Sequence, residues 1–260
     1  MDPKQQFVEE RKKILKAFQN SQEGNDLSRE WITFAQTHKY SYQFDWMGRP
    51  IIQYPQDMVA MQELVWSIKP DLIIETGIAH GGSLIMNASF LALLELAEAI
   101  ESGEMIDPAK PKRKVLGIDI DIREHNKKAI ENHPMSNRID MIQGSSIAPE
   151  IIEQVKQYAQ EFNTILICLD SNHTHEHVLA ELEAYAPLTS IGSYCVVFDT
   201  AVEDMPEEMF LDRPWGPGDN PKTAVWKYLE SHNEFKIDKN IEGKLLLTMA
   251  SDGYLLKTGL

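Results

Sequence analysis

The chain has 260 residues, of which 43% are hydrophobic, and a formal net charge of -15 at pH 7. This length suits one α/β domain with extensions, large enough to enclose a full core. The excess of acids argues against broad binding to nucleic acids or to anionic membranes, because both need a basic surface.

The amino-terminal residues 1–39 are charged and carry apolar residues at helical spacing. They predict two helices outside the core fold, joined by a loop over residues 21–27. We expect this extension either to cover the functional site or to build the interface of a homo-oligomer. Residues 40–260 are expected to form a single domain.

The start of the chain is polar and lacks the apolar centre of a signal peptide. No apolar stretch approaches the ~20 residues that a membrane helix needs. The two cysteines, Cys168 and Cys195, both lie in apolar, strand-like runs, so buried free thiols are expected rather than a disulfide. These features predict a cytoplasmic protein that has neither a nucleic acid nor a membrane as its partner.

Strand-like and helix-like segments alternate along most of the chain, which indicates a parallel sheet flanked by helices. Residues 40–54 are irregular and rich in aromatics, and a helix follows from Pro55 to Pro70. Strands are expected at 72–75, 115–119, 139–142, 164–170 and 192–199, with helices at 84–100, 123–132, 148–162 and 175–186. After a long loop, the chain predicts a helix at 223–231 and strands at 235–238 and 245–248. The last of these is expected to form an edge hairpin with residues 253–257.

The stretch Asp71–Leu84 has the layout of a nucleotide-type site. A short apolar strand leads into a loop with glycines at 77, 81 and 82, and a helix follows. Glycines let the backbone approach a ligand, and the start of a helix presents free N–H groups. The spacing matches neither the P-loop nor G-x-G-x-x-G, so the pattern favours a small adenosine-type cofactor without a pyrophosphate. The alternative is a strand-to-helix turn whose glycines serve packing alone.

Four predicted strands end in acids, namely Glu75, Asp119, Asp170 and Asp199. Ligands of open parallel sheets bind beyond these strand ends, where converging acids raise one another's pKa unless a cation or hydrogen-bond donors hold them. The acid ending the second strand suits the hydroxyls of a ribose. Those ending the fourth and fifth strands can share Mg²⁺, Ca²⁺ or Mn²⁺. The alternatives are helix capping for Asp119 and Asp170 and a solvated loop position for Asp199.

The run His173–His177 holds three histidines directly after the fourth strand. One interpretation is a zinc site of a metal-dependent hydrolase. We favour another, in which His173, three residues after Asp170, accepts a proton near neutral pH and the other two histidines are solvated. In the long loop of residues 200–221, Arg213 and Trp215 are candidates for closing over a substrate, against the alternative of a rigid surface loop.

Taken together, these motifs resemble those of the cephalosporin hydroxylase family over roughly residues 40–258. The resemblance rests on the Glu-x-Gly-x-x-x-Gly-Gly-Ser loop, the acid ending the second strand, Gly144-Ser-Ser, Leu169-Asp-Ser-Asn-His-Thr-His and Arg213-Pro-Trp-Gly-Pro-Gly-Asp-Asn-Pro. Despite its name, this family looks like S-adenosylmethionine-dependent methyltransferases and includes rhamnosyl O-methyltransferases. The resemblance implies a Rossmann-like class I methyltransferase fold, with a mostly parallel seven-stranded sheet, helices on both faces and a reversed last strand.

The resemblance also implies a reaction, which is methyl transfer from S-adenosylmethionine to a hydroxyl of a small molecule such as a sugar or a natural product. Residues at the methionine and ribose end of the cofactor would be Glu75, Gly77, Ala79 and Ser83. Asp119 would bind the ribose hydroxyls, and Ser145 or Ser146 would lie near the adenine.

The layout is also similar to that of the catechol O-methyltransferases, which implies a Mg²⁺ site. Its ligands would be Asp170, Asp199 and Thr200, and His173 would take the proton of the acceptor hydroxyl in place of a lysine. Thr200 stands where those enzymes carry an amide. Phe198 stands where cephalosporin hydroxylase relatives carry the first of two adjacent acids, and Glu203 or Asp204 is a candidate replacement. Phe198 also favours a third interpretation, a non-catalytic partner subunit that keeps the fold and binds cofactor or substrate.

Overall fold

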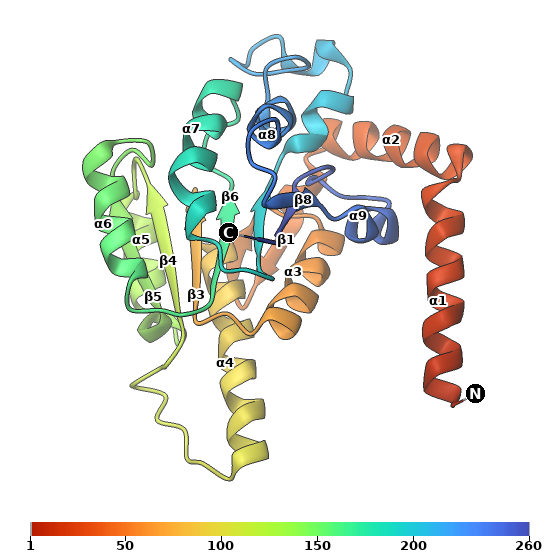
Figure 1. Ribbon diagram of the computed structural model, residues 1–260. Coiled ribbons are helices and arrows are strands. Elements are labelled where there is room, and N and C mark those ends of the chain that lie inside the picture. Colours follow the sequence, from red (N-terminus) through yellow and green to blue (C-terminus); the bar gives the residue numbers. More distant parts are fainter. Residues whose placement is uncertain (1, 260) are drawn as a thin grey trace.

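A seven-stranded sheet forms the centre of the computed structural model, which describes residues 2–259 (Figure 1). The strand order is β5-β4-β3-β6-β7-β9-β8. The bounds are β3 Leu72–Thr76, β4 Lys114–Asp119, β5 Ile139–Gln143, β6 Ile165–Leu169, β7 Tyr194–Val197, β8 Phe235–Ile237 and β9 Tyr254–Lys257. Pairs β3–β4, β3–β6, β4–β5 and β6–β7 are parallel, whereas β9 runs antiparallel to both β7 and β8. The predicted mostly parallel sheet with a reversed last strand is therefore confirmed.

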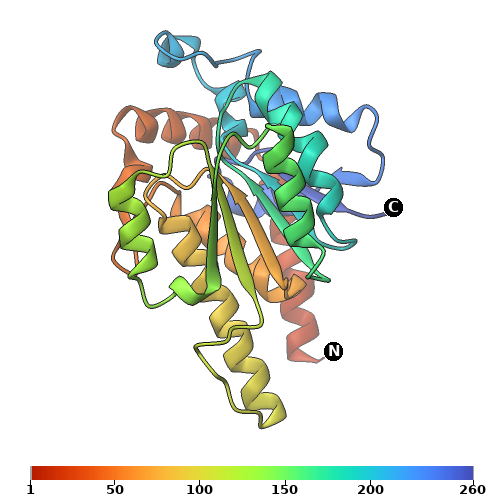
Figure 2. The same cartoon turned by 90° about the vertical axis from the view of Figure 1, so that its left-hand side faces the viewer.

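Helices cover both faces of this sheet, as predicted (Figure 2). Apolar side chains of α3, α4 and α5 pack on one face, and those of α6, α7 and α8 pack on the other. The bounds are α3 Pro55–Ile68, α4 Gly82–Ser102, α5 Glu124–Glu131, α6 Pro149–Ala159, α7 His175–Tyr185 and α8 Pro221–Leu229. Successive side chains of a strand point to opposite sides of the sheet. Because helices cover both sides, the central strands are buried on both faces.

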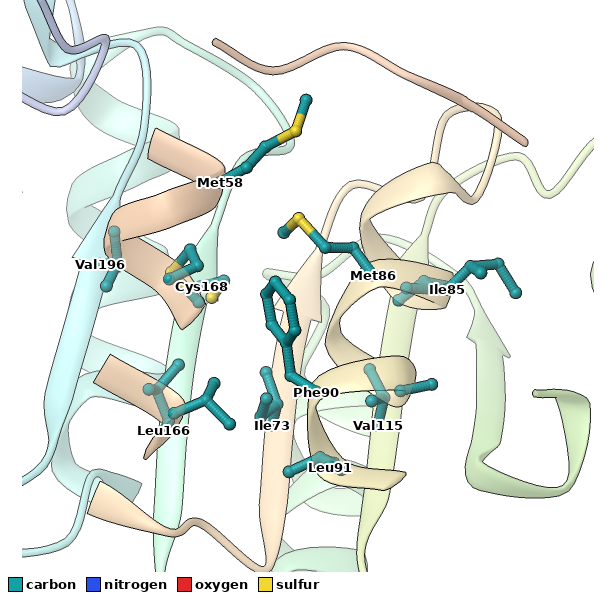
Figure 3. Close-up of a cluster of buried hydrophobic side chains, with 14 of the residues drawn as sticks. Met58, Ile73, Ile85, Met86, Phe90, Leu91, Val115, Leu166, Cys168 and Val196 are labelled. Atoms are coloured by element: carbon teal, nitrogen blue, oxygen red, sulfur yellow. The ribbon is translucent and has the colours of Figure 1, made fainter. Parts of the chain in front are cut away.

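The core shows this alternation in β3 and β6. Ile73 belongs to the cluster under α3 and α4, whereas its neighbours Leu72 and Ile74 belong to the cluster on the other face. Figure 3 shows part of the first cluster, in which Phe90 of α4 lies among residues of the sheet. Cys168 packs in the first cluster and Cys195 in the second, so both are buried free thiols on opposite faces, as expected.

Helix α4 is, among the described residues, the one helix long and apolar enough to cross a membrane by length and composition. The expectation that no stretch reaches this length was therefore wrong. Half of its apolar window is buried inside the molecule, where it packs on β3 and β4. The apolar composition of α4 thus has an explanation in the core of the fold.

The amino-terminal helices are α1, Pro3–Gln19, and α2, Gln22–Thr37. Figure 1 shows α1 standing beside the body of the molecule, and it has no buried residue. The predicted loop over residues 21–27 was wrong, because Ser21 caps α2 by accepting a hydrogen bond from the Gly24 N–H at 3.0 Å and the helix starts at once. The division between residues 39 and 40 stays a prediction.

Two further segments differ from expectation. Residues 40–54 contain a small hairpin, β1 Phe44–Trp46 and β2 Arg49–Ile51. The predicted strand over residues 245–248 was wrong, since α9, Lys239–Leu245, ends at its first residue and residues 246–248 are irregular. Thr248 and Met249 donate to the buried carboxylate of Asp57, which holds them against α3 and away from the sheet. The edge hairpin forms between β8 and β9, with α9 inserted between its strands.

Candidate functional site

A cavity of about 300 Å³ lies at the carboxyl ends of β3, β4, β6 and β7. Residues that follow these four strands form one part of its wall: Gly77, Ile78, Ala79, His80, Gly82, Ser83, Asp119, Asp170, Ser171, His173, Phe198 and Asp199. The segment from α2 to the start of α3 forms another: Gln36, Ser41, Tyr42, Pro50, Ile51, Ile52, Gln53 and Tyr54. The cavity therefore occupies the position that ligands take in open α/β sheets.

The loop after β3 approaches its neighbours closely. Gly77 has φ +89°, and a Cβ there would lie 2.0 Å from the Asp170 carbonyl oxygen, so only glycine fits. Ala79 also has a positive φ of 45°, a left-handed conformation that costs a residue with a side chain ~1–3 kcal/mol. One carboxylate oxygen of Asp119 accepts from Ile78 N–H at 2.8 Å and Ala79 N–H at 3.4 Å, which holds the loop in this shape.

The alternative that Asp119 and Asp170 merely cap helices finds no support in the contacts. Helix α5 begins after Arg123 without a side-chain cap, and the second oxygen of Asp119 accepts from Asp121 N–H. At the start of α7, His175 N–H donates to Asp219 at 2.7 Å. Both strand-end acids are thus free of a capping role, and both line the cavity.

Glu75 lies behind the loop and is 3% exposed. It accepts hydrogen bonds from the Ser83 hydroxyl and from Asn87 Nδ2, the latter at 2.9 Å. Burial raises the pKa of Glu75 to about 8, although the bond from Ser83 opposes this. Glu75 therefore carries a proton through most of the neutral range. Its hydrogen bonds link the end of β3 to the first turns of α4.

The two serines predicted near an adenine lie outside the lining of the cavity. Ser146 is buried, and its hydroxyl is 3.0 Å from His177 Nε2. Its carbonyl oxygen accepts from the Tyr185 hydroxyl. The roles of Ser145 and Ser146 stay predictions.

Asp170, His173 and Asp199 converge at one end of the cavity. His173 Nε2 is 3.6 Å from Asp170 Oδ1, and His173 Nδ1 is 3.0 Å from Asp199 Oδ2. One potential ligand atom from each residue lies within 4.8 Å of the others. Asp199 has φ +54°, a strained conformation that the surrounding structure must hold.

The electrostatics of this cluster follow from its geometry. Burial raises the pKa of Asp170 to about 6, and the negative charge of Asp199 adds to the rise, whereas the bond to His173 opposes it. Burial lowers the pKa of His173, but Asp199 and Asp170 outweigh this and raise it to about 9. The two acids thus hold the imidazole in its protonated form, which cannot accept a further proton.

The contacts around the cluster bear on Thr200 as a metal ligand and on Glu203 or Asp204 as a replacement for the acid missing at Phe198. Thr200 is fully buried and its hydroxyl donates to the Met249 carbonyl at 3.3 Å, so it is not part of the cluster. Glu203 accepts from Gly218 N–H and Asp204 pairs with Lys222, so neither acid replaces the one missing at Phe198. The ligand role of Thr200 stays a prediction that these contacts do not support.

The three histidines after β6 face three different sets of partners. His173 contacts the two acids, His175 Nδ1 lies 2.8 Å from the Thr223 hydroxyl, and His177 contacts Ser146 and Glu181. A zinc ion needs its ligands around one point. The hydrolase interpretation based on the His173–His177 run therefore lacks a site.

The long loop of residues 200–221 reaches the cluster through Trp215. The Trp215 ring meets the His173 ring edge-on, with centroids 5.0 Å apart, and the Arg213 guanidinium lies 5.4 Å from the Trp215 ring centre. Two short 3₁₀ turns, Thr200–Asp204 and Glu207–Phe210, give the loop internal structure. This position agrees with a role in covering a substrate, which stays a prediction.

Sequence reasoning missed the wall contributed by the segment before α3. Gln53 is 7% exposed and its Nε2 donates to Asp170 Oδ2 at 3.3 Å. Tyr54 lines the same cavity and packs edge-on against Trp31 of α2. The only signal in the sequence was the irregular, aromatic-rich composition of residues 40–54, which does not point to Gln53.

Known proteins resemble the chain in both sequence and fold. A family model described as Rhamnosyl O-methyltransferase/CmcI matches residues 38–258. The Rhamnosyl O-methyltransferase of Mycobacterium tuberculosis H37Rv is 30% identical over 217 residues, which cover 82% of this chain and 77% of that protein. The protein of the same name from Mycobacterium leprae is 29% identical over 214 residues and covers 82% of each chain.

Among solved structures, "CmcI-N160 apo-structure" and "cmcI-D160 Mg-SAM" are similar to the chain. Their TM-scores are 0.55 and 0.53, each at 17% identity and covering 84% of this chain and 78% of theirs. At this identity the similarity concerns the fold, and it agrees with the seven-stranded sheet described above.

Proposed function

The chain belongs to the rhamnosyl O-methyltransferase/CmcI family, and on this premise we propose that it transfers a methyl group from S-adenosylmethionine to a hydroxyl of a small molecule. The observation that carries the proposal is a single cavity with Asp119 at one strand end and the cluster of Asp170, His173 and Asp199 at two others. The acceptor would be a sugar or a hydroxylated natural product, in line with the relatives' name.

The cofactor would lie along the loop after β3. Gly77 lets the loop pack closely against Asp170, Ala79 lines the cavity beside it, and Asp119 supports the loop through two backbone N–H groups. Asp119 has carboxylate oxygens at the edge of the cavity, so it can also accept hydrogen bonds from ribose hydroxyls. Glu75 and Ser83 form the floor beneath the loop.

Asp170 and Asp199 would hold a divalent cation, for which hard carboxylate oxygens are suited. The fit rests on one potential ligand atom each from Asp170, His173 and Asp199, which all lie within 4.8 Å of one another. Asp199 also has a strained backbone conformation. When bound, such a cation orients an acceptor hydroxyl and lowers its pKa. The family member CmcI has a structure named with Mg and SAM.

His173 would then accept the acceptor proton. Because Asp170 and Asp199 both face it, the imidazole is protonated at neutral pH. The base role therefore requires that the proposed cation balance the negative charge of the two acids. Trp215, edge-on to His173, would exclude water from this end of the cavity. The chain's own contribution to rate is mainly the alignment of the two substrates.

Calorimetry with S-adenosylhomocysteine tests the cofactor site, and absence of binding would end the proposal. Asp119→Asn keeps the size of the side chain but loses one acceptor oxygen, so cofactor affinity should fall roughly tenfold. Asp121→Asn, at an exposed position, is the matched control. Asp170→Ala should abolish turnover of a sugar acceptor and spare cofactor affinity. Cofactor binding without turnover across a broad acceptor panel would favour the non-catalytic subunit instead.

We further propose a cytoplasmic homo-oligomer in which α1 packs against a second copy of the chain. Phe7, Ile14 and Phe18 of α1 are 60%, 54% and 44% exposed. Residues 3–19 carry five basic and two acidic residues, a net charge of +3 within a chain of -15, so α1 complements the acidic surface of another copy. Light scattering should show an oligomer that Phe7→Ser with Ile14→Ser dissociates, and a monomeric wild type would contradict this.

A further inference from the structure

The hairpin β1–β2 is fastened to the elements that frame the cavity. Arg49 Nε donates to the His80 carbonyl at 3.0 Å, and Trp46 Nε1 donates to the Ser89 hydroxyl at 3.0 Å. A Cβ on Gly82 would lie 2.2 Å from the Pro50 carbonyl oxygen, so the hairpin lies directly on the start of α4. The residues between the hairpin and α3 are therefore held firmly beside the strand ends.

Gln53 is the residue of this segment that reaches an acid of the cluster. Its side chain is 7% exposed, and its amide nitrogen donates to Asp170 Oδ2 at 3.3 Å. The other oxygen of the same carboxylate, Oδ1, faces His173 Nε2 at 3.6 Å. The two oxygens of Asp170 thus have separate neighbours, a neutral donor on one side and the imidazole on the other.

This arrangement defines the orientation of the carboxylate. A carboxylate that contacts a partner through one oxygen alone can rotate about its last bond, which spreads its second oxygen over many directions. A neutral amide donor on Oδ2 removes that freedom without adding a charge. It also leaves Oδ1 facing His173, in the cluster where one ligand atom each of Asp170, His173 and Asp199 lies within 4.8 Å of the others.

We propose that Gln53 is a positioning residue, which orients the Asp170 carboxylate for a divalent cation bound between Asp170 and Asp199. The inference rests on the proposed function insofar as that function includes the cation. It assigns a role to the segment before α3, because Gln53, which precedes the parallel sheet in the chain, orients the carboxylate of Asp170 at the end of β6. Donors to a metal-bound carboxylate commonly change metal affinity by 10–100-fold.

The test is the affinity for Mn²⁺, measured by electron paramagnetic resonance on the full-length protein. Gln53→Met keeps the length of the side chain and removes the donor, and the dissociation constant should rise roughly tenfold. Gln53→Asn keeps an amide that is one methylene too short, and it should show the same direction if the methionine variant does not fold. Gln62→Met, at an exposed position on α3, should equal the wild type.

The S-adenosylhomocysteine affinity of each variant separates positioning from a general structural effect. Unchanged cofactor affinity with weakened Mn²⁺ binding supports the proposal, whereas a Mn²⁺ affinity within twofold of wild type in both Gln53 variants overturns it. An equal loss of both affinities also overturns it. If the wild type binds Mn²⁺ but no cofactor, the proposed function fails while the role of Gln53 is still decided by the variants. If the wild type binds no Mn²⁺, the role of Gln53 falls, and cofactor binding then decides the rest of the proposed function.

Discussion

Asp57 of α3 gives a quantitative link between burial and stability. Its carboxylate is fully buried and accepts from the Thr248 hydroxyl, from Met249 N–H at 2.9 Å and from the Tyr254 hydroxyl at 2.9 Å. Burial nevertheless outweighs these donors and raises the pKa of Asp57 from its usual 3.8 to about 6. The folded state therefore holds the proton more tightly than the unfolded state, and the contribution of Asp57 to stability is lost as the pH rises through about 6.

The size of this effect follows from the two pKa values. Each tenfold change in proton affinity corresponds to 1.36 kcal/mol, so ionised Asp57 costs about 3 kcal/mol at pH 7.5 relative to its protonated form at pH 3.8 and below. The perturbation is Asp57→Asn, which does not titrate. Subtracting the variant's free energy of unfolding from that of wild type at each pH cancels the other acids that both proteins share.

Urea unfolding monitored by tryptophan fluorescence from pH 4 to pH 7.5 measures this difference. The wild type should lose about 2–3 kcal/mol relative to Asp57→Asn across this range, with most of the loss between pH 4 and pH 6. The variant itself is expected to be less stable at pH 4, because one amide oxygen cannot serve three donors. A difference that stays flat, or one that grows in favour of wild type as the pH rises, would refute the reasoning.

Four further variants test the packing and the hydrogen bonds of the site and of the core. Gly77→Ala should remove cofactor binding and lower the melting temperature by several degrees, because its Cβ would meet the Asp170 carbonyl oxygen at 2.0 Å; a wild-type melting temperature would contradict this. Tyr254→Phe should cost ~1.5–3 kcal/mol in urea unfolding, since its hydroxyl donates to a buried carboxylate. Tyr228→Phe, whose buried hydroxyl has no partner, should be neutral or stabilising, and a loss equal to that of Tyr254→Phe would contradict the importance of the hydrogen bond to Asp57. Glu75→Gln should gain melting temperature relative to wild type as the pH rises from 4.5 to about 8, because burial raises the pKa of Glu75 from 4.5 to about 8 and the folded state then binds its proton more tightly than the unfolded state.

The segments that sequence reasoning placed well are those whose local pattern and tertiary role agree. The apolar runs of β3 and β6 are buried on both faces of the sheet, so composition alone identifies them. Residues 21–27 were read as a loop for their polar composition, yet Ser21 caps a helix there. Residues 245–248 have a strand-like composition, but their hydrogen bonds go to Asp57 of α3. Distant partners outweigh local preference in such short segments.

The sequence by itself determined the fold class and the convergence of the strand-end acids. Parallel strands that alternate with helices must place their carboxyl ends on one edge, so Asp119, Asp170 and Asp199 had to gather there. Only the tertiary structure decided which side chains face the cluster. In the folded chain the Thr200 hydroxyl donates to a backbone carbonyl, and Gln53 donates to Asp170, which lies 117 residues away in the sequence. Such choices depend on the packing of elements far apart in the chain, which no local pattern encodes.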